Sequence, residues 1–208
     1  MLNSIKITDI TKTKKGFNAL FCDSGFLFSV DDMLLAQEKI EIGSCFTQQE
    51  LTLLCEKSCT NKAVQKAYNV LSFRSHSRKE LFDKLCKNFD RECASAACDK
   101  MENLGLINDE EYCKAKAEYL INTKMCSLSE TRLKLLTLGI NKDIIECCID
   151  MYDNENEAEN LRVLIEKKYR NKLDQPQKVI AALMRKGFGY YEIKNALRSL
   201  EIETEDDY

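Results

Sequence analysis

The chain has 208 residues, of which 44% are hydrophobic and 31% charged, and its formal net charge at pH 7 is −3. This length is enough to bury a core, and no stretch approaches the ~18 apolar residues of a membrane-spanning helix, so we expect no membrane span. The first residues lack the basic start and apolar run of a signal peptide, which predicts a cytoplasmic protein.

The first sixty residues predict a small β-rich region. Residues 5–10 alternate between apolar and polar side chains, which is the period of a half-buried strand. Residues 17–21 and 26–30 predict two further strands, joined by a tight turn at Asp23-Ser24-Gly25. Residues 39–43 are a candidate for one more strand.

Helices are expected to follow one another through the rest of the chain. A short helix begins at Asp31-Asp32, and Thr47-x-x-Glu50 is a capping box, the pattern in which a side chain at each end satisfies a free N–H of the first helical turn. The same pattern recurs at Ser77-x-x-Glu80, Asn108-x-x-Glu111 and Ser127-x-x-Glu130. Pro176 suits the first turn of a later helix, because that position needs no N–H donor.

A helix-turn-helix pattern occurs three times, at intervals of about fifty residues. The residues at the three turns are Asn88, Gly139 and Gly187. Glycine, with asparagine as second choice, suits a helix end where the chain turns left-handed. Large apolar residues directly follow the three turn residues, and others stand three positions before them: Phe89, Ile140 and Phe188, and Leu85, Leu136 and Met184.

The repeated pattern predicts a mainly α fold, built as three tandem three-helix repeats in an elongated helical array, with a small β-rich N-terminal extension. Each repeat needs its neighbours because a short helical unit cannot bury its apolar face alone. The expected parts are an extension at 1–60, repeats at 61–108, 109–153 and 154–200, and an acidic tail at 201–208.

Eleven cysteines and one histidine, His76, are the residues that suggest metal binding. No two cysteines have the C-x-x-C spacing, and the paired short-loop ligands of a zinc site are absent from the sequence. We therefore expect reduced thiols that pack as small apolar groups, with no metal and no cofactor. Neither a phosphate-binding glycine loop nor a catalytic constellation is present, which predicts that the chain is not an enzyme.

Positive charge is concentrated in the third repeat. Residues 157–200 contain ten Lys and Arg against five Asp and Glu, whereas residues 201–208 contain five acids and no base. The densest basic run is Lys167-Lys168-Tyr169-Arg170-Asn171-Lys172. Such a run can bind phosphates, with Tyr169 as a stacking face for a base. It is equally typical of the C-terminal end of a helix, where cations interact favourably with the helix dipole.

Three landmarks of the sequence together resemble the RecX family of regulators of the RecA recombinase. The first is Leu71-x-x-Arg74-x-x-Ser77-Arg78-x-Glu80-Leu81, and the second is the junction Leu104-Gly105-Leu106-Ile107-Asn108-Asp109-Glu110-Glu111-Tyr112. The third is Leu183-x-x-Lys186-Gly187-Phe188. The resemblance covers residues 61–200, and it departs from the family pattern at Asn88, where glycine is usual, and at Leu138, where a basic residue is usual.

The resemblance implies a non-enzymatic protein that binds the RecA–single-stranded-DNA filament. It would limit filament growth, and so damp strand exchange and co-protease activity during DNA repair, recombination and the SOS response. Single-stranded DNA is a candidate second partner, and a monomer is expected. The candidate partner-binding residues are Arg74, Arg78, Lys79, Arg132, Lys167, Lys168, Arg170, Lys172, Arg185 and Lys186.

Other interpretations stay open at this point. Each of these basic residues could simply belong to a solvated helix face, as most surface charges do. A helix-turn-helix protein that binds DNA without RecA would share the repeats, although its recognition helices normally carry base-reading side chains. The third helices predicted here, at 90–104, 141–152 and 189–200, contain acids, alanines and cysteines instead. A helical scaffold for another partner is the remaining alternative.

Overall fold

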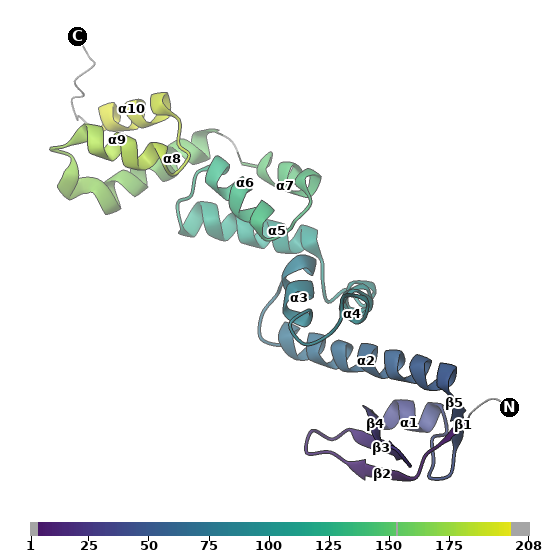
Figure 1. Cartoon of the computed structure of the whole chain (residues 1–208). Helices are drawn as coiled ribbons and strands as arrows, with labels where there is room; N and C mark the ends of the chain where they lie inside the picture. The colour runs from purple at the N-terminus through teal and green to yellow at the C-terminus, as the bar shows by residue number, and fades with distance from the viewer. Residues whose placement is uncertain (1–3, 153, 201–208) are drawn as a thin grey trace. The chain divides into compact units, whose positions relative to one another are not determined.

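The computed structural model describes residues 4–152 and 154–200, and these residues confirm the predicted fold class, mainly α with a small β-rich N-terminal part (Figure 1). The chain divides into two compact units. The first unit contains the chain up to His76 together with Leu81–Ile107, and the second contains Ser77–Glu80 together with the chain from Asn108 onward.

The N-terminal strands form two small antiparallel sheets in the first unit. One has the order β2 (Asp9–Lys12), β3 (Asn18–Cys22), β4 (Gly25–Val30), and the other pairs β1 (Ser4–Lys6) with β5 (Cys45–Thr47). The predicted strand at 5–10 is therefore two strands, because Ile7 donates its N–H to Ser44 and Thr8 donates to Phe21.

The strand predicted at residues 39–43 is wrong. Lys39 has φ 50° and Gly43 has φ 101°, so the backbone turns twice within this segment. A ladder needs extended backbone at consecutive residues, and only from Cys45 onward is that available. The buried Ile40 still contributes to the apolar core that the N-terminal strands share with Leu51 and Leu54.

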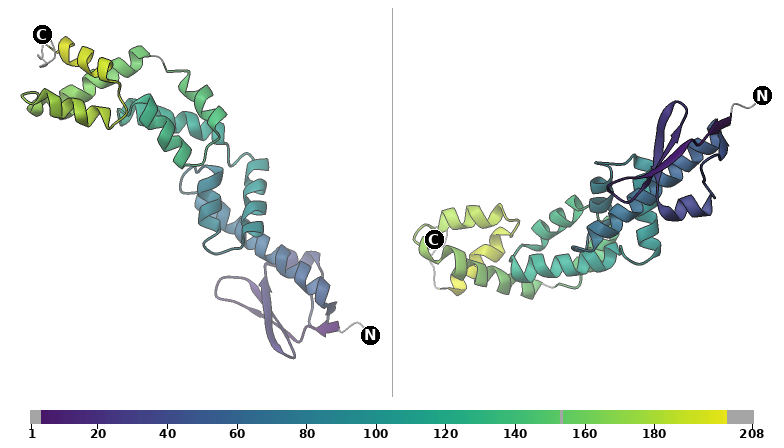
Figure 2. Two further views of the ribbon diagram at one scale, coloured as in Figure 1. Left: turned by 45° about the horizontal axis from the view of Figure 1, so that its top comes forward. Right: turned by 90° about the horizontal axis from the view of Figure 1, so that it is seen from below.

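Helix α2 (Gln48–Leu71) links the β-rich part to the first repeat. It begins with the predicted capping box, in which Glu50 and Thr47 bind each other's backbone N–H. Its first turns pack on the N-terminal core, and its later turns contribute Ala63, Val64 and Ala67 to the core of the first repeat. The helix runs without a break across residues 60 and 61, and it lies beside the strands in every view (Figures 1 and 2).

The other helices of the described residues, apart from the short α1 (Asp32–Gln37), complete three groups of three. The first group adds α3 (Arg78–Leu85) and α4 (Arg91–Asn103) to α2. The second consists of α5 (Asp109–Glu118), continued by the π-helical turn η1 (Tyr119–Thr123), with α6 (Leu128–Thr137) and α7 (Lys142–Ile149). The third consists of α8 (Asn154–Leu164), continued by η2 (Ile165–Tyr169) and η3 (Arg170–Lys172), with α9 (Pro176–Met184) and α10 (Tyr190–Ser199).

The predicted left-handed turns are present in the second and third repeats only. Gly139 has φ 77° and Gly187 has φ 83°, whereas Asn88 does not have positive φ, so the prediction for Asn88 is wrong. The reason is that the first turn is one residue shorter. Phe89 donates its N–H to the carbonyl four residues back, whereas Ile140 and Phe188 donate to carbonyls five residues back.

This difference also corrects the register of the apolar residues before the turns. Leu85 is equivalent to Leu135 and Leu183, and all three are fully buried. Leu136 and Met184, which the sequence pattern placed in the packed set, are instead 45% and 50% exposed. Among the described residues, no helix has the length and apolar character to cross a bilayer.

The corrected register can be tested by truncating one leucine of each kind. We expect Leu85→Ala to lower the free energy of unfolding by ~2–5 kcal/mol, because it leaves a cavity in the core. Leu136→Ala should change it by less than ~0.5 kcal/mol, because the side chain is half exposed. Urea unfolding of both variants measures the difference, and equal losses would contradict the register.

Candidate partner-binding surface

A buried serine connects each repeat to the one that follows it. Ser127 accepts the N–H of Glu130 at 3.0 Å, which caps its own helix, and donates its hydroxyl to the carbonyl of Lys186 at 2.7 Å. Ser77 makes the same pair of bonds, accepting from Glu80 at 3.1 Å and donating to Leu138 at 2.6 Å. Both serines are fully buried. Each serine hydroxyl therefore belongs at once to its own helix cap and to the turn of the next repeat.

A second hydrogen bond accompanies the serine at each of these two joints. The backbone N–H of Leu128 donates to the Glu157 carboxylate at 2.8 Å, and that of Arg78 donates to Asp109 at 2.8 Å. The first N–H groups of a helix have no partner within the helix, and they favour a negative charge. A carboxylate at the start of the next repeat supplies both the acceptor and the charge. The two joints therefore have the same kind of hydrogen bond, although the carboxylate belongs to Asp109 in one and to Glu157 in the other.

Glycine is needed at Gly139 and Gly187 for a second reason besides their backbone angle. A Cβ at Gly187 would lie 2.8 Å from the Ser127 hydroxyl oxygen and 3.2 Å from Cβ of Ser129. At Gly139 it would overlap the side chain of Lys79. A Cβ at either position would therefore displace a neighbouring side chain, a cost that adds to that of the positive φ.

The third repeat has neither the serine nor the first-turn N–H that form the other two joints. Gln175 stands at the helix start equivalent to Ser77 and Ser127, and its side chain makes no cap bond. Pro176 follows at the first helical position, where it has no N–H to offer to a carboxylate. The serine cap and the first-turn N–H of the other two joints are therefore missing from this helix start.

Two glycine-to-alanine variants separate backbone strain from the joint contact. Gly105 has φ +69° and open space where a Cβ would lie, so Gly105→Ala should cost only the ~1–2 kcal/mol of a left-handed alanine. Gly187→Ala should cost more than that, because its Cβ also meets the Ser127 hydroxyl. Thermal and urea unfolding give both values, and a Gly187→Ala loss no larger than that of Gly105→Ala would contradict the joint.

A hollow of about 420 Å³ in the second unit collects lysines from two repeats. Its lining contains Leu120, Cys126, Thr137 and Leu138, together with Tyr119 and no acidic residue. We call it the five-lysine pocket, after Lys116, Lys124, Lys134, Lys168 and Lys186. The ammonium groups of Lys116 and Lys124 lie 5.7 and 5.3 Å from the centre of the Tyr119 ring, within range of cation–π attraction.

One carboxylate next to the pocket offsets part of this charge. Glu130 accepts a hydrogen bond from Lys134 at 2.9 Å. Burial alone would raise the pKa of Glu130, but the Lys134 bond and the nearby charge of Lys186 more than compensate and lower it. Glu130 therefore stays ionised and neutralises one lysine, which leaves the pocket strongly positive. Such a pocket attracts anions, phosphate groups above all.

The structure divides the predicted basic residues of the third repeat among different places. Lys168 and Lys186 line the five-lysine pocket, whereas Lys172 and Arg185 line a separate hollow of about 420 Å³ beside Tyr169. Lys167 and Arg170 are exposed and line neither hollow. The basic run is split in this way because it passes from a π-helical turn into a 3₁₀ turn, so neighbouring residues point in different directions.

The other predicted residues have structural contacts of their own. Arg132 is partly buried and forms an ion pair with Glu146 at 2.9 Å. Arg78 supplies its backbone N–H to the joint, and Lys79 lies against Gly139. Arg74 is exposed and donates to the carbonyl of Ser75 at 2.9 Å.

Sequence reasoning missed Lys116, Lys124 and Lys134. They belong to the second repeat, in which acids outnumber bases, and they are spread over nineteen positions of the chain. Only the Glu130–Lys134 spacing of four residues was a local signal, and it indicates an ion pair rather than a pocket. Their convergence depends on how η1, α6 and the third repeat pack.

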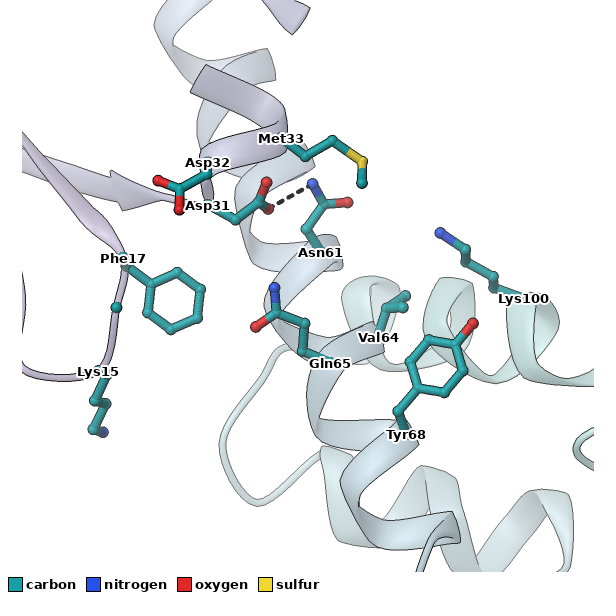
Figure 3. A pocket seen from close by; sticks show the side chains of 11 residues that line it. Lys15, Phe17, Asp31, Asp32, Met33, Asn61, Val64, Gln65, Tyr68 and Lys100 are labelled. Atoms are coloured by element: carbon teal, nitrogen blue, oxygen red, sulfur yellow. Dashed lines mark hydrogen bonds between the residues drawn. The ribbon is translucent and has the colours of Figure 1, made fainter. Parts of the chain in front are cut away.

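A hollow of about 470 Å³ in the first unit is lined by the loop between β2 and β3, the start of α1, α2 and Lys100 of α4 (Figure 3). Its two acids are already engaged. Asp31 caps α1 through Leu34 and accepts a hydrogen bond from Asn61 at 2.8 Å, the dashed line in the figure. Asp32 accepts hydrogen bonds from Lys12 and Asn18. Both lower the pKa of Asp32, and the bond from Lys12 has the larger effect. Both carboxylates hold structure in place, so this hollow offers no pair poised for acid–base chemistry.

Tandem three-helix repeats with serine–glycine joints define a helical-repeat protein. Residues 155–197 match the model of the third three-helix domain of RecX. The chain is 30% identical to the regulatory protein RecX of Listeria welshimeri, over 98% of this chain and 78% of that protein. It is 31% identical to the RecX protein of Caldanaerobacter subterraneus subsp. tengcongensis, over 92% and 98%. The chain therefore belongs to the RecX family of regulatory proteins.

Solved structures agree with this fold. A crystal structure of a regulatory protein RecX, 24% identical in sequence, matches 91% of this chain and 97% of its own length with a TM-score of 0.70. The crystal structure of RecX from Lactobacillus salivarius, 27% identical, matches 70% of this chain and 98% of its own with a TM-score of 0.60.

Proposed function

We propose that this protein binds the RecA–single-stranded-DNA filament and mostly inhibits the recombinase and co-protease activities of RecA in DNA repair. It would do so in the cytoplasm, as a monomer, and without catalysis of its own. Membership of a family of regulatory proteins supports the regulatory role. The observation that carries the contact with a nucleoprotein is the five-lysine pocket, which two successive repeats build together.

The architecture suits a partner that is itself a repeating polymer. Two joints with the same hydrogen bonds give the successive repeats equivalent connections. A series of similar units offers similar contact points at regular intervals, which is how repeat proteins bind extended partners. The basic side chains would then meet phosphates of the DNA or carboxylates of RecA.

The same pocket favours a second candidate function, direct binding of single-stranded DNA without RecA. Lysines around an aromatic ring are typical of sites that hold a phosphate backbone and stack a base. Tyr119, which is exposed to 43%, supplies such a ring. The two functions differ in whether RecA is needed for tight binding, and this difference can be measured.

The test reverses three charges of the pocket, in the variant Lys116→Glu, Lys124→Glu, Lys168→Glu. These three lysines are chosen so that Lys134 and Lys186, which interact with Glu130, are left unchanged. We expect filament binding, measured by co-sedimentation with RecA on single-stranded DNA, to weaken by on the order of tenfold or more. The loss should shrink at high salt, since screening already weakens the unmodified contact.

A matched control reverses Lys6, Lys14 and Lys142, which are exposed and lie outside the pocket. This variant has the same change in net charge and should bind nearly as well as the unmodified protein. Equal binding by both variants would contradict the role of the pocket. Binding to single-stranded DNA alone that matches binding to the filament, together with unchanged RecA ATPase activity, would favour the second candidate.

A further inference from the structure

Two thiols and a carboxylate converge at the edge of the first unit's core, where Cys93 is buried, Cys59 half-buried and Asp90 exposed. Cys59 comes from α2, Asp90 stands directly before α4, and Cys93 lies in the first turn of α4. Their ligand atoms all lie within 4.8 Å of one another, and the Cys59 sulfur is 3.5 Å from Oδ2 of Asp90. In the part of the chain that the structure describes, no other three such groups come together in this way.

The donor set and its dimensions fit a zinc ion. Zinc prefers four ligands in a tetrahedron and takes thiolates at ~2.3 Å and carboxylates at ~2.0–2.2 Å, so neighbouring ligand atoms stand ~3.3–3.8 Å apart. The three ligand atoms lie within 4.8 Å of one another, and the 3.5 Å between the Cys59 sulfur and Oδ2 of Asp90 is inside that range. Two soft sulfurs select zinc over magnesium and calcium, which prefer sites made of oxygen alone.

We propose that Cys59, Asp90 and Cys93 bind one zinc ion that joins α2 to α4. The fourth position of the tetrahedron is open to water. Cys55 precedes Cys59 by one helical turn and so lies on the same face of α2, where it is the nearest further thiol along that helix. This site is independent of the five-lysine pocket and of the proposed function.

The surroundings of Asp90 orient it for this role. Its Oδ1 accepts the backbone N–H of Cys93 at 2.7 Å, which caps α4 and holds the carboxylate in place. Oδ2 faces Cys59 and is the oxygen available to an ion. A hydrogen bond that fixes a ligand from behind is the usual support of a metal site. The hydroxyl of Thr60, 3.7 Å from the sulfur of Cys93, adds a second such contact.

Without a cation, the Asp90 carboxylate is ionised while the Cys59 thiol keeps its proton. Burial, followed by the proximity of Cys93 and Asp90, raises the pKa of the Cys59 thiol to about 12. Hydrogen bonds from Cys93 lower the pKa of Asp90, which therefore stays ionised next to the thiols. A divalent cation would reverse this balance: each thiol would lose its proton to solvent as its sulfur binds the metal.

The ligands escaped the sequence search because they lie 31 and 34 residues from Cys59, at no recognised spacing. Another pair of thiols shows what distinguishes the cluster at Cys59. Cys113 and Cys148 are buried together in the second repeat, and burial, as the largest effect, raises the pKa of Cys113 to about 12. Among the described residues, no third ligand atom joins them within the same distance, so they serve as a comparison within the same molecule.

The test titrates the reduced, metal-free, full-length protein with Co²⁺, a spectroscopic substitute for zinc. We expect one equivalent to bind, with a thiolate-to-cobalt charge-transfer band, release of protons, and displacement of cobalt by zinc. Cys59→Ser, Cys93→Ser and Asp90→Asn should each weaken cobalt binding by ~10-fold or more. Asp90→Asn is informative because asparagine keeps the helix cap and so preserves folding.

The control is Cys147→Ser, which removes an exposed thiol of α7 and should leave cobalt binding unchanged. Zinc should raise the melting temperature of the unmodified protein and of this control, but not of the three site variants. Circular dichroism confirms folding of each variant. The proposal is overturned if no charge-transfer band appears, or if the band and its affinity persist in Asp90→Asn and in either cysteine variant.

Discussion

The buried serine hydroxyl at each joint is the interaction on which the series of repeats depends. It closes the first turn of its own helix and also satisfies the carbonyl that precedes the next glycine. Around it lie a glycine with positive φ, whose Cβ would meet Lys79 at Gly139 and Ser127 at Gly187, and a carboxylate of the following repeat that accepts a first-turn N–H. Among the described residues no joint of this kind precedes the first repeat, where Asn88 stands in a shorter turn without positive φ.

The joint also places the candidate binding site. Lys186 accepts the Ser127 hydrogen bond with its carbonyl and directs its side chain toward the five-lysine pocket, where it joins lysines of the second repeat. Glu130, whose N–H the same serine accepts, neutralises Lys134 at the edge of that pocket. The residues that hold two repeats together are thus direct neighbours of those proposed to bind the filament, so changes at the joint should affect both stability and binding.

Local features of the fold could be predicted from the sequence, because capping boxes and glycine turns depend on neighbouring residues alone. Ser77, Ser127, Gly139 and Gly187 were identified in this way, but only as caps and turns. Their shared hydrogen bonds connect positions about sixty residues apart, which no local pattern shows. The five-lysine pocket and the cluster at Cys59 were missed for the same reason, since tertiary packing brings their members together. The prediction for Asn88 was wrong because Asn88 has the same spacing to its apolar neighbours as the two glycines, whereas its turn is one residue shorter.

The most direct test of this account compares two helix caps by urea unfolding. Asn141→Ala removes an exposed cap that binds only its own helix, and should cost ~1 kcal/mol. Ser127→Ala removes a cap of the same kind and also leaves the buried carbonyl of Lys186 without its partner, so its cost should exceed that of Asn141→Ala by ~1–3 kcal/mol. Equal losses in the two variants would mean that Ser127 acts as a cap alone, and would contradict the claim that a shared hydroxyl joins the repeats.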